Sequence, residues 1–450
     1  MTDSSAAELV AESSLHDALD AICASGVFRH SPQQQRFLRH LLAKMHKGDL
    51  GALREMTLGI ELFQRPPEAF DPKKDPIVRV EARRLRERLF RYYAAEGAAA
   101  TIEVVLPIGR YVPLVRARRL LPAVGPALPA TASALEERGW YLMRMRTIEG
   151  YRGALDLFTR ATEEFVDFAA AYRGVAWARI CINGHDGLPP EAIVQRAPIA
   201  AAIEKAASIE PAHPHLLILK GAYATRFEQN LALAYSLHNA GIAAAAGMSS
   251  MRTSLGWLHL LSGRFMEAEQ VFNAAFALDP YGFWHRHNLA SLAYVRRQYD
   301  AAEELLGEAL EIEPTHAVMR LLLARVLMLN GRAAQALEQT QWCMRALPGM
   351  AGPQLWRIAA LASAGETGSA RAALRAFDSS FAGRYVSPVC RAIACNAVGE
   401  LDRALEWLTM AAEQRDYWLP NVATEPAFDA LRGRPEFART LVSAGLPLVV

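Results

Sequence analysis

The stretch SSMRTSLGWLHLLSGRFMEAEQVFNAAFALDPYG, residues 249–282, decides the fold of this 450-residue chain. It has the apolar spacing of two amphipathic helices, separated by a turn at Gly263. Gly256 and Ala268 are small residues at the positions where the two helices would cross closely, and Phe272 would fill the adjacent hole. The stretch therefore predicts one compact helix–turn–helix unit.

The unit recurs every 34 residues. One alanine position repeats without a miss, at Ala234, Ala268, Ala302, Ala336, Ala370 and Ala404. Proline and glycine series keep the same phase, at Pro280, Pro314 and Pro348 and at Gly263, Gly331, Gly365 and Gly399. This period is that of the tetratricopeptide repeat, whose helix pairs stack into a solenoid. We predict an array of about eight helix pairs over residues 134–418, with an insertion at 183–190 and a C-terminal cap at 419–450.

Stacked repeats bury a continuous core and leave a concave face, which usually binds a peptide or a folded protein. Tryptophans of the array could anchor such a partner, although packing between helices is their more common role. The tryptophans concerned are Trp257, Trp284, Trp342, Trp356 and Trp407.

Residues 1–117 follow a different plan. Ser31, with Gln34 three positions later, has the pattern of a capping box that opens a helix ending near residue 47. A shorter helical run follows at 53–62, and Asp75-Pro76 is a strong start for a third helix ending near residue 95. Three helices are therefore expected in this domain.

A β-hairpin is expected after the third helix. Apolar residues alternate at Ile102, Val104 and Leu106, a turn follows around 107–110, and a second strand would run through Tyr111-Val112. Three helices followed by a hairpin is the plan of a winged helix, in which the last helix enters the major groove of DNA. The expected fold class is thus mainly α, with a winged helix followed by a tetratricopeptide-repeat solenoid.

The third helix has an apolar face and an arginine face. Its apolar positions, Val78, Ala82, Leu85, Leu89, Tyr92 and Tyr93, should pack inward. The stretch 76–119 contains ten arginines and four acidic residues, although the whole chain has a net charge of only +2. This asymmetry fits a nucleic-acid-binding surface. It also fits a solvated face with internal pairs such as Arg83–Glu87, and the two interpretations stand near parity.

The segments FDPKKDPIVRVEARRLR (70–86) and LPIGRYVP (106–113) add a family resemblance. Residues 27–114 resemble the predicted winged-helix domain that heads many bacterial tetratricopeptide-repeat transcriptional regulators. The resemblance implies DNA binding through Arg79, Arg83, Arg84 and Arg86 on the helix and Arg110 and Tyr111 on the wing. Ile108 and Arg110 depart from the pattern, because such hairpins more often carry a basic residue and a small residue there.

No membrane-embedded or secreted protein is expected. The segment 118–133 contains three prolines and has no clear period, so it is predicted to be a linker and not a membrane helix. The N-terminus lacks the basic and apolar regions of a secretory signal. Five cysteines without a Cys-x-x-Cys pair suit a reducing, cytoplasmic environment.

Motifs that carry chemistry are missing from the sequence. No phosphate-binding loop, dinucleotide-binding glycine motif or nucleophile elbow occurs. The close histidine pairs, His213/His215 and His285/His287, have no cysteine or carboxylate at metal-site spacing. An enzyme is therefore not expected, and neither a cofactor nor a metal is predicted.

The expected function is that of a cytoplasmic, bacterial-type transcriptional regulator that binds specific DNA. Its repeat array would sense or dock a protein or peptide partner in the concave face. The alternative is a tetratricopeptide-repeat scaffold that does not bind DNA, in which the arginine helix packs on an acidic partner or on the array itself. A weaker third option is an enzyme subunit whose catalytic partner is held by the repeats.

Overall fold

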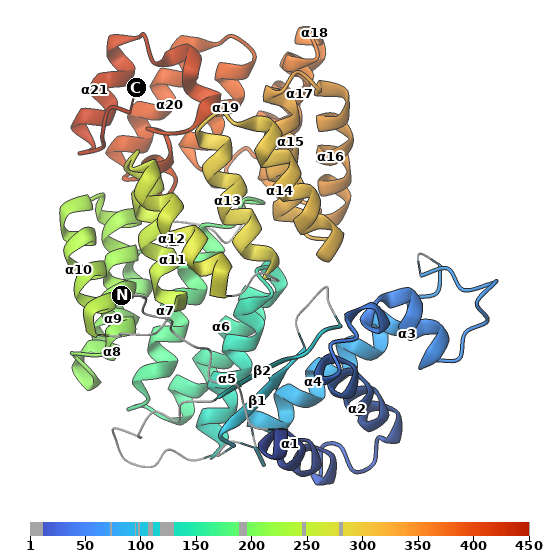
Figure 1. Ribbon diagram of the computed structural model, residues 1–450. Coiled ribbons are helices and arrows are strands. Elements are labelled where there is room, and N and C mark those ends of the chain that lie inside the picture. The colour runs from blue at the N-terminus through green and yellow to red at the C-terminus, as the bar shows by residue number, and fades with distance from the viewer. Residues whose placement is uncertain are drawn as a thin grey trace, which may run out of the picture. The chain divides into compact units, whose positions relative to one another are not determined.

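The chain forms two compact units in the computed structural model shown in Figure 1, Met1–Glu137 and Arg138–Val450. We refer to them as the N-terminal and the C-terminal unit, and the division falls inside helix α5. The structure describes residues 12–72, 74–94, 96–97, 100–106, 111–117, 130–188, 196–244, 249–278 and 282–449. The predicted linker at 118–133 lies mostly outside these residues.

The N-terminal unit consists of helices and one two-stranded hairpin. Its elements are α1 (Glu12–Ala24), α2 (Pro32–His46), the 3-10 helix η1 (Leu50–Leu53), α3 (Glu55–Glu61), α4 (Ile77–Ala94), β1 (Ile102–Val105) and β2 (Leu114–Ala117). The predicted inward face of α4 is confirmed, since its six apolar residues are all 6% exposed or less. Helix α1 was not predicted, and its Ile22 is buried in the same core.

Asp75 and Ser31 were both predicted to cap a helix with their side chains, and only Asp75 does so. Asp75 caps α4 as predicted, because its Oδ1 accepts a hydrogen bond from the Ile77 amide at 3.0 Å. A side-chain bond from Arg65 also holds the pKa of Asp75 below its usual value. Helix α2 begins after Ser31 and ends before Lys47 as predicted. The capping box was wrong, since Ser31 makes no side-chain cap bond and the Gln34 side-chain amide donates to the buried Glu81 carboxylate.

The hairpin lies later in the chain than the sequence predicted. Strands β1 and β2 are antiparallel, with Val105 opposite Leu114. The predicted second strand at Tyr111-Val112 was therefore wrong. Pro113 has no amide hydrogen to donate to a strand ladder, so the pairing starts after it. The predicted turn at 107–110 lies outside the described residues, and the winged-helix assignment remains a proposal.

The described residues from α5 onward form eight helix pairs, the first of which begins ahead of the C-terminal unit, and successive pairs stack against one another (Figure 1). The pairs are α5 (Ala130–Arg144) and α6 (Ile148–Glu164), α7 (Ala169–Asn183) and α8 (Arg196–Ile209), α9 (Pro214–Tyr223) and α10 (Leu231–Ala244), α11 (Ser249–Leu261) and α12 (Phe265–Leu278), α13 (Phe283–Val295) and α14 (Tyr299–Ile312), α15 (Ala317–Leu329) and α16 (Ala333–Ala346), α17 (Ala351–Ser363) and α18 (Thr367–Ser380), and α19 (Pro388–Ala397) and α20 (Leu401–Glu413). A π-helical turn, η2 (Ala224–Glu228), extends α9, and the chain ends with η3 (Leu419–Asn421), η4 (Pro426–Leu431) and α21 (Pro435–Ser443).

The repeating positions have the structural roles that the period predicted. All six alanines of the series are 0% exposed. The turn glycine Gly263 has a φ of +72°, and its three counterparts have φ values of +76° to +81°, a region that side chains disfavour. A Cβ atom on Gly256 would lie 2.5 Å from the Phe272 ring, so the close helix crossing requires glycine there. The helical repeat array is thus confirmed.

The two helices of a pair differ in how they are buried. Helix α14 buries a single stripe, Ala302, Leu306 and Ala309. Helix α15 buries eight residues distributed around its axis, and α13 and α17 are similar. A helix that is buried on all sides must be covered by more than its own partner. The first helices of these central pairs therefore form an inner layer that other parts of the chain cover.

Among the described residues, no helix is both long enough and apolar enough to span a membrane.

Candidate functional site

Arg79 and Tyr111, two residues predicted to bind DNA, meet at one carboxylate of the N-terminal unit. The Arg79 guanidinium lies 3.0 Å from the Glu55 carboxylate and also donates to the Pro72 carbonyl. The Tyr111 hydroxyl is hydrogen-bonded to Glu55 as well. Burial raises the pKa of both Glu55 and Tyr111. The charge of Arg79 is thus engaged within the unit.

Arg84 and Arg86 have different environments. Arg84 lies 2.5 Å from the buried Glu81 carboxylate, yet its side chain remains 62% exposed. The Nε atom of Arg86 donates to the Leu106 carbonyl at 2.9 Å and ties α4 to the hairpin. The Arg83 side chain and all of Arg110 lie outside the described residues. Of the predicted DNA-binding side chains that the structure describes, Arg84 alone exposes more than half of its surface.

In the C-terminal unit, the described part of the connection between α7 and α8 covers part of the inner layer. We call residues 184–188 the inner loop. Its backbone binds the start of α17, where the Gly352 amide donates to the Gly187 carbonyl at 2.9 Å and the Ala351 amide to the Leu188 carbonyl at 3.5 Å. Leu188 itself is 8% exposed. The sequence predicted an insertion here but not its position on the inner layer.

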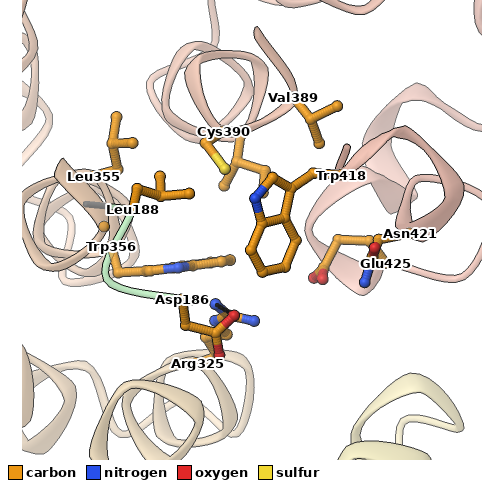
Figure 2. Close-up of a pocket in the computed structure, with 12 residues that line it drawn as sticks. Asp186, Leu188, Arg325, Leu355, Trp356, Val389, Cys390, Trp418, Asn421 and Glu425 are labelled. Atoms are coloured by element: carbon orange, nitrogen blue, oxygen red, sulfur yellow. Dashed lines mark ion pairs between the residues drawn. The ribbon is translucent and has the colours of Figure 1, made fainter. Parts of the chain in front are cut away.

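A buried ion pair joins the inner loop to α15. The Asp186 carboxylate lies 3.5 Å from the Arg325 guanidinium, with side chains 13% and 12% exposed (Figure 2). The guanidinium of Arg325 also lies over the Trp356 ring, 4.3 Å from its centroid. In such a low-dielectric environment a paired charge is held strongly, whereas an unpaired charge would be costly. The ion pair between Arg325 and Asp186 therefore holds the inner loop against α15.

The C-terminal segment also crosses to the inner layer. Glu425 accepts a hydrogen bond from Tyr294 on α13, and Asp429 pairs with Arg297 at the end of the same helix. Further along the fold, Arg226 of η2 donates to Asn421 at 2.6 Å. The sequence predicted that this segment caps the last hydrophobic face. The structure shows that it also bridges repeats far from it in the sequence.

Asp416 anchors the start of this segment. Its carboxylate accepts hydrogen bonds from Tyr385 at 2.6 Å, from Ser387 at 2.7 Å and from the Trp418 amide at 3.0 Å. The residue is 1% exposed, and burial raises the pKa of its carboxyl. The satisfied carboxylate fixes the turn from which Trp418 projects.

A small cavity of about 30 Å³ remains beside the inner loop. Figure 2 shows Trp356 and Trp418 facing it, with Arg325 and Glu425 at its polar end. A water needs roughly 10–15 Å³ of such volume, so the cavity has room for about two waters and not for a metabolite.

Sequence reasoning missed the residues that meet here, Asp186, Arg325, Asp416, Trp418 and Glu425. One signal was available, because Arg325 interrupts the apolar run of α15, AVMRLLLARVLML. A charge in such a run indicates a buried partner. The partner itself, Asp186, comes from a distant insertion and could not be read from periodicity.

The predicted tryptophans mainly pack between helices. Trp356 is 6% exposed, and Trp257, Trp284, Trp342 and Trp407 are half-buried against the core clusters.

Within the described residues no cluster of three or more histidine, cysteine, aspartate or glutamate side chains could hold a metal ion. The predicted histidine pairs have structural positions instead. His213 Nδ1 accepts a hydrogen bond from the His215 amide at 3.2 Å, and His287 stacks on Trp284 with ring centroids 4.2 Å apart.

Residues 296–341 match a family described as tetratricopeptide repeat. No curated protein sequence matches the chain. The match and the stacked helix pairs around it support a tetratricopeptide-repeat array in the C-terminal unit. Neither finding supports a winged-helix domain or DNA binding, which remain proposals.

Several solved structures are similar to this chain at low sequence identity. The human IFIT1 dimer with m7Gppp-AAAA is 13% identical, with a TM-score of 0.50, over 97% of this chain and 95% of that chain. A tetratricopeptide repeat protein from Parabacteroides merdae is 14% identical, with a TM-score of 0.40, over 62% and 100%. A thermophilic repeat protein from Thermus thermophilus is 21% identical, with a TM-score of 0.33, over 43% and 100%. At these identities the likeness concerns the fold alone.

Proposed function

We propose that the protein is a docking platform that binds a protein partner through its repeat array. The observation that carries this proposal is the inner layer, whose helices already hold an irregular chain segment by backbone, ionic and apolar contacts at once. Stacked repeats present such a layer to partners in general.

Cross-linking of the tagged protein in its native cells, followed by mass spectrometry, tests this proposal. We expect at least one protein to be linked reproducibly to defined residues of the C-terminal unit, because a specific interface fixes which residues lie close to the partner. Links scattered over the whole surface, with no partner recovered repeatedly, would contradict it.

DNA binding by the N-terminal unit is a second candidate function. The exposed Arg84 on α4, within a stretch rich in arginine and followed by a hairpin, favours it. The pairing of Arg79 with Glu55 weighs against it, because that charge is already neutralised within the unit.

If the N-terminal unit binds DNA, Arg84→Ala should weaken binding by about 1–3 kcal/mol when the side chain meets a base edge. Binding should also fall steeply with added salt, because phosphate contacts release counterions. A mobility-shift titration of the full chain measures both effects. Arg29→Ala, at an exposed position of the same unit outside α4, is the matched control. Absence of a shift at about 50 mM salt would count decisively against this function.

A further inference from the structure

The inner loop has the contacts of a bound peptide. Three kinds of contact hold it. The Asp186 carboxylate forms an ion pair with Arg325, and the first two amides of α17 donate to the Gly187 and Leu188 carbonyls. The apolar Leu188 side chain lies beside Leu355 (Figure 2). None of these contacts depends on the covalent link to α7. A separate chain with an aspartate two residues before a leucine could make all of them.

The fit between the loop and the array is close. A Cβ atom on Gly352 would lie 2.1 Å from the Asp186 carbonyl oxygen, so only glycine allows the loop backbone to approach. Leu188 has a φ of +51°, a left-handed conformation that costs free energy for a leucine. Such conformations persist where surrounding contacts determine them, and they are common where a chain is clamped.

The receiving surface is complementary in charge to an acidic segment. Arg325 is buried and braced against Trp356, so its guanidinium is held ready for a carboxylate. The backbone amides at the start of a helix carry partial positive charge and donate hydrogen bonds to carbonyl or carboxylate oxygens. The apolar side chains of Leu355, Val389 and Ile393 line the same pocket. An acidic residue followed by a leucine satisfies each of these features.

We propose that this surface is the docking site for an acidic Asp-x-Leu peptide of a protein partner, and that the inner loop occupies it as an internal competitor. The inference rests on the proposed docking function and names the site and the chemistry of the partner. A tethered segment acts at an effective concentration of about 1 mM, so a peptide with the same contacts at about 1 μM is outcompeted roughly a thousandfold. The loop therefore keeps the site closed until the partner binds more strongly or the loop is loosened.

Binding of a fluorescent acetyl-Asn-Gly-His-Asp-Gly-Leu peptide, the sequence of residues 183–188, tests the proposal by fluorescence polarisation. The proteins are the full-length wild type and the variants Asp186→Asn and Leu188→Ala, each of which weakens the internal competitor at a different contact. We expect both variants to bind the peptide at least about tenfold more tightly than the wild type, because the loop loses a charge-assisted contact in Asp186→Asn and buried apolar surface in Leu188→Ala. A peptide with asparagine in place of the aspartate should bind at least about tenfold more weakly.

Two glycine substitutions supply the matched control. Gly352 and Gly368 are the second residues of α17 and α18, and a Cβ atom on Gly368 would meet nothing within 4 Å. Added to Asp186→Asn, Gly352→Ala should abolish peptide binding because the methyl group takes the place of the peptide backbone. Gly368→Ala should leave binding unchanged.

Circular dichroism of every variant verifies that it is folded. Equal binding by wild type and variants, equal binding of the asparagine peptide, or no binding to either loosened variant would overturn the proposal. These outcomes would not contradict the proposed docking function, because the cross-linking experiment detects a protein partner at any surface of the chain.

Discussion

Arg325→Leu is expected to lower the free energy of unfolding of the C-terminal unit by about 3–5 kcal/mol, the cost of leaving buried charge without its partner. Arg325 is 12% exposed and faces the Asp186 carboxylate at 3.5 Å, with Glu425 lining the same pocket. Leucine would fill part of the space over Trp356 but would leave the carboxylates without a cation. Urea unfolding followed by circular dichroism measures the change.

Arg332→Leu is the control for this substitution. Arg332 pairs with Glu303, but its side chain is 44% exposed and water can replace the partner. Exposed pairs contribute about 0–1 kcal/mol, so this variant should remain close to the wild type. If Arg325→Leu were equally mild, the pair with Asp186 would not hold the inner loop in place.

A second large effect is expected when the pH is lowered. Burial lowers the pKa of His287 to about 3 and that of His316 to about 4, from an ordinary value of 6.5. Both rings are therefore neutral in the folded chain and become protonated on unfolding at acidic pH. The stability that such a histidine contributes is complete above the pKa of the ring in the unfolded chain. That stability is lost as the pH falls toward the lower pKa of the ring in the folded chain. From pH 6.5 to 5.0 each should cost about 2 kcal/mol.

The pH effect is isolated by comparing variants. Burial raises the pKa of Asp416 and Glu425, and these carboxyls act in the opposite direction as the pH falls. His287→Phe should keep the stacking on Trp284 and flatten the dependence by about 1.4 kcal/mol per pH unit. Leu292→Ala, a buried change on the same helix without a titrating group, should lower stability while keeping the wild-type slope. An unchanged slope in His287→Phe would show that this histidine is not the origin.

The repeat array could be predicted because its unit is local. Gly256, Ala268 and Phe272 lie within one 34-residue stretch, and each contacts its neighbours in a way that helix geometry dictates. The buried face of α4 could be predicted for the same reason, since the helix period alone separates its apolar side from its arginines. Local periodicity thus fixed which residues form the core of each element.

Other predictions failed because they depended on competing partners. Ser31 had the sequence of a cap, but Gln34 found a buried carboxylate on α4 instead of completing the box. The second strand was placed three residues early, because a pattern of apolar residues does not show how Pro113 limits the pairing. The DNA-binding surface stays a prediction, since it depends on exposed arginines of which one, Arg79, pairs with Glu55.

The sequence by itself determined the repeating helix pairs, since small and aromatic residues recur at a spacing that only one kind of local packing satisfies. Only the tertiary structure decided what covers the inner layer. The contacts of Asp186 with Arg325 and of Glu425 with Tyr294 join residues more than a hundred positions apart, and no periodic signal links them. A buried charge must find a partner, but burial does not specify from which part of the chain the partner comes.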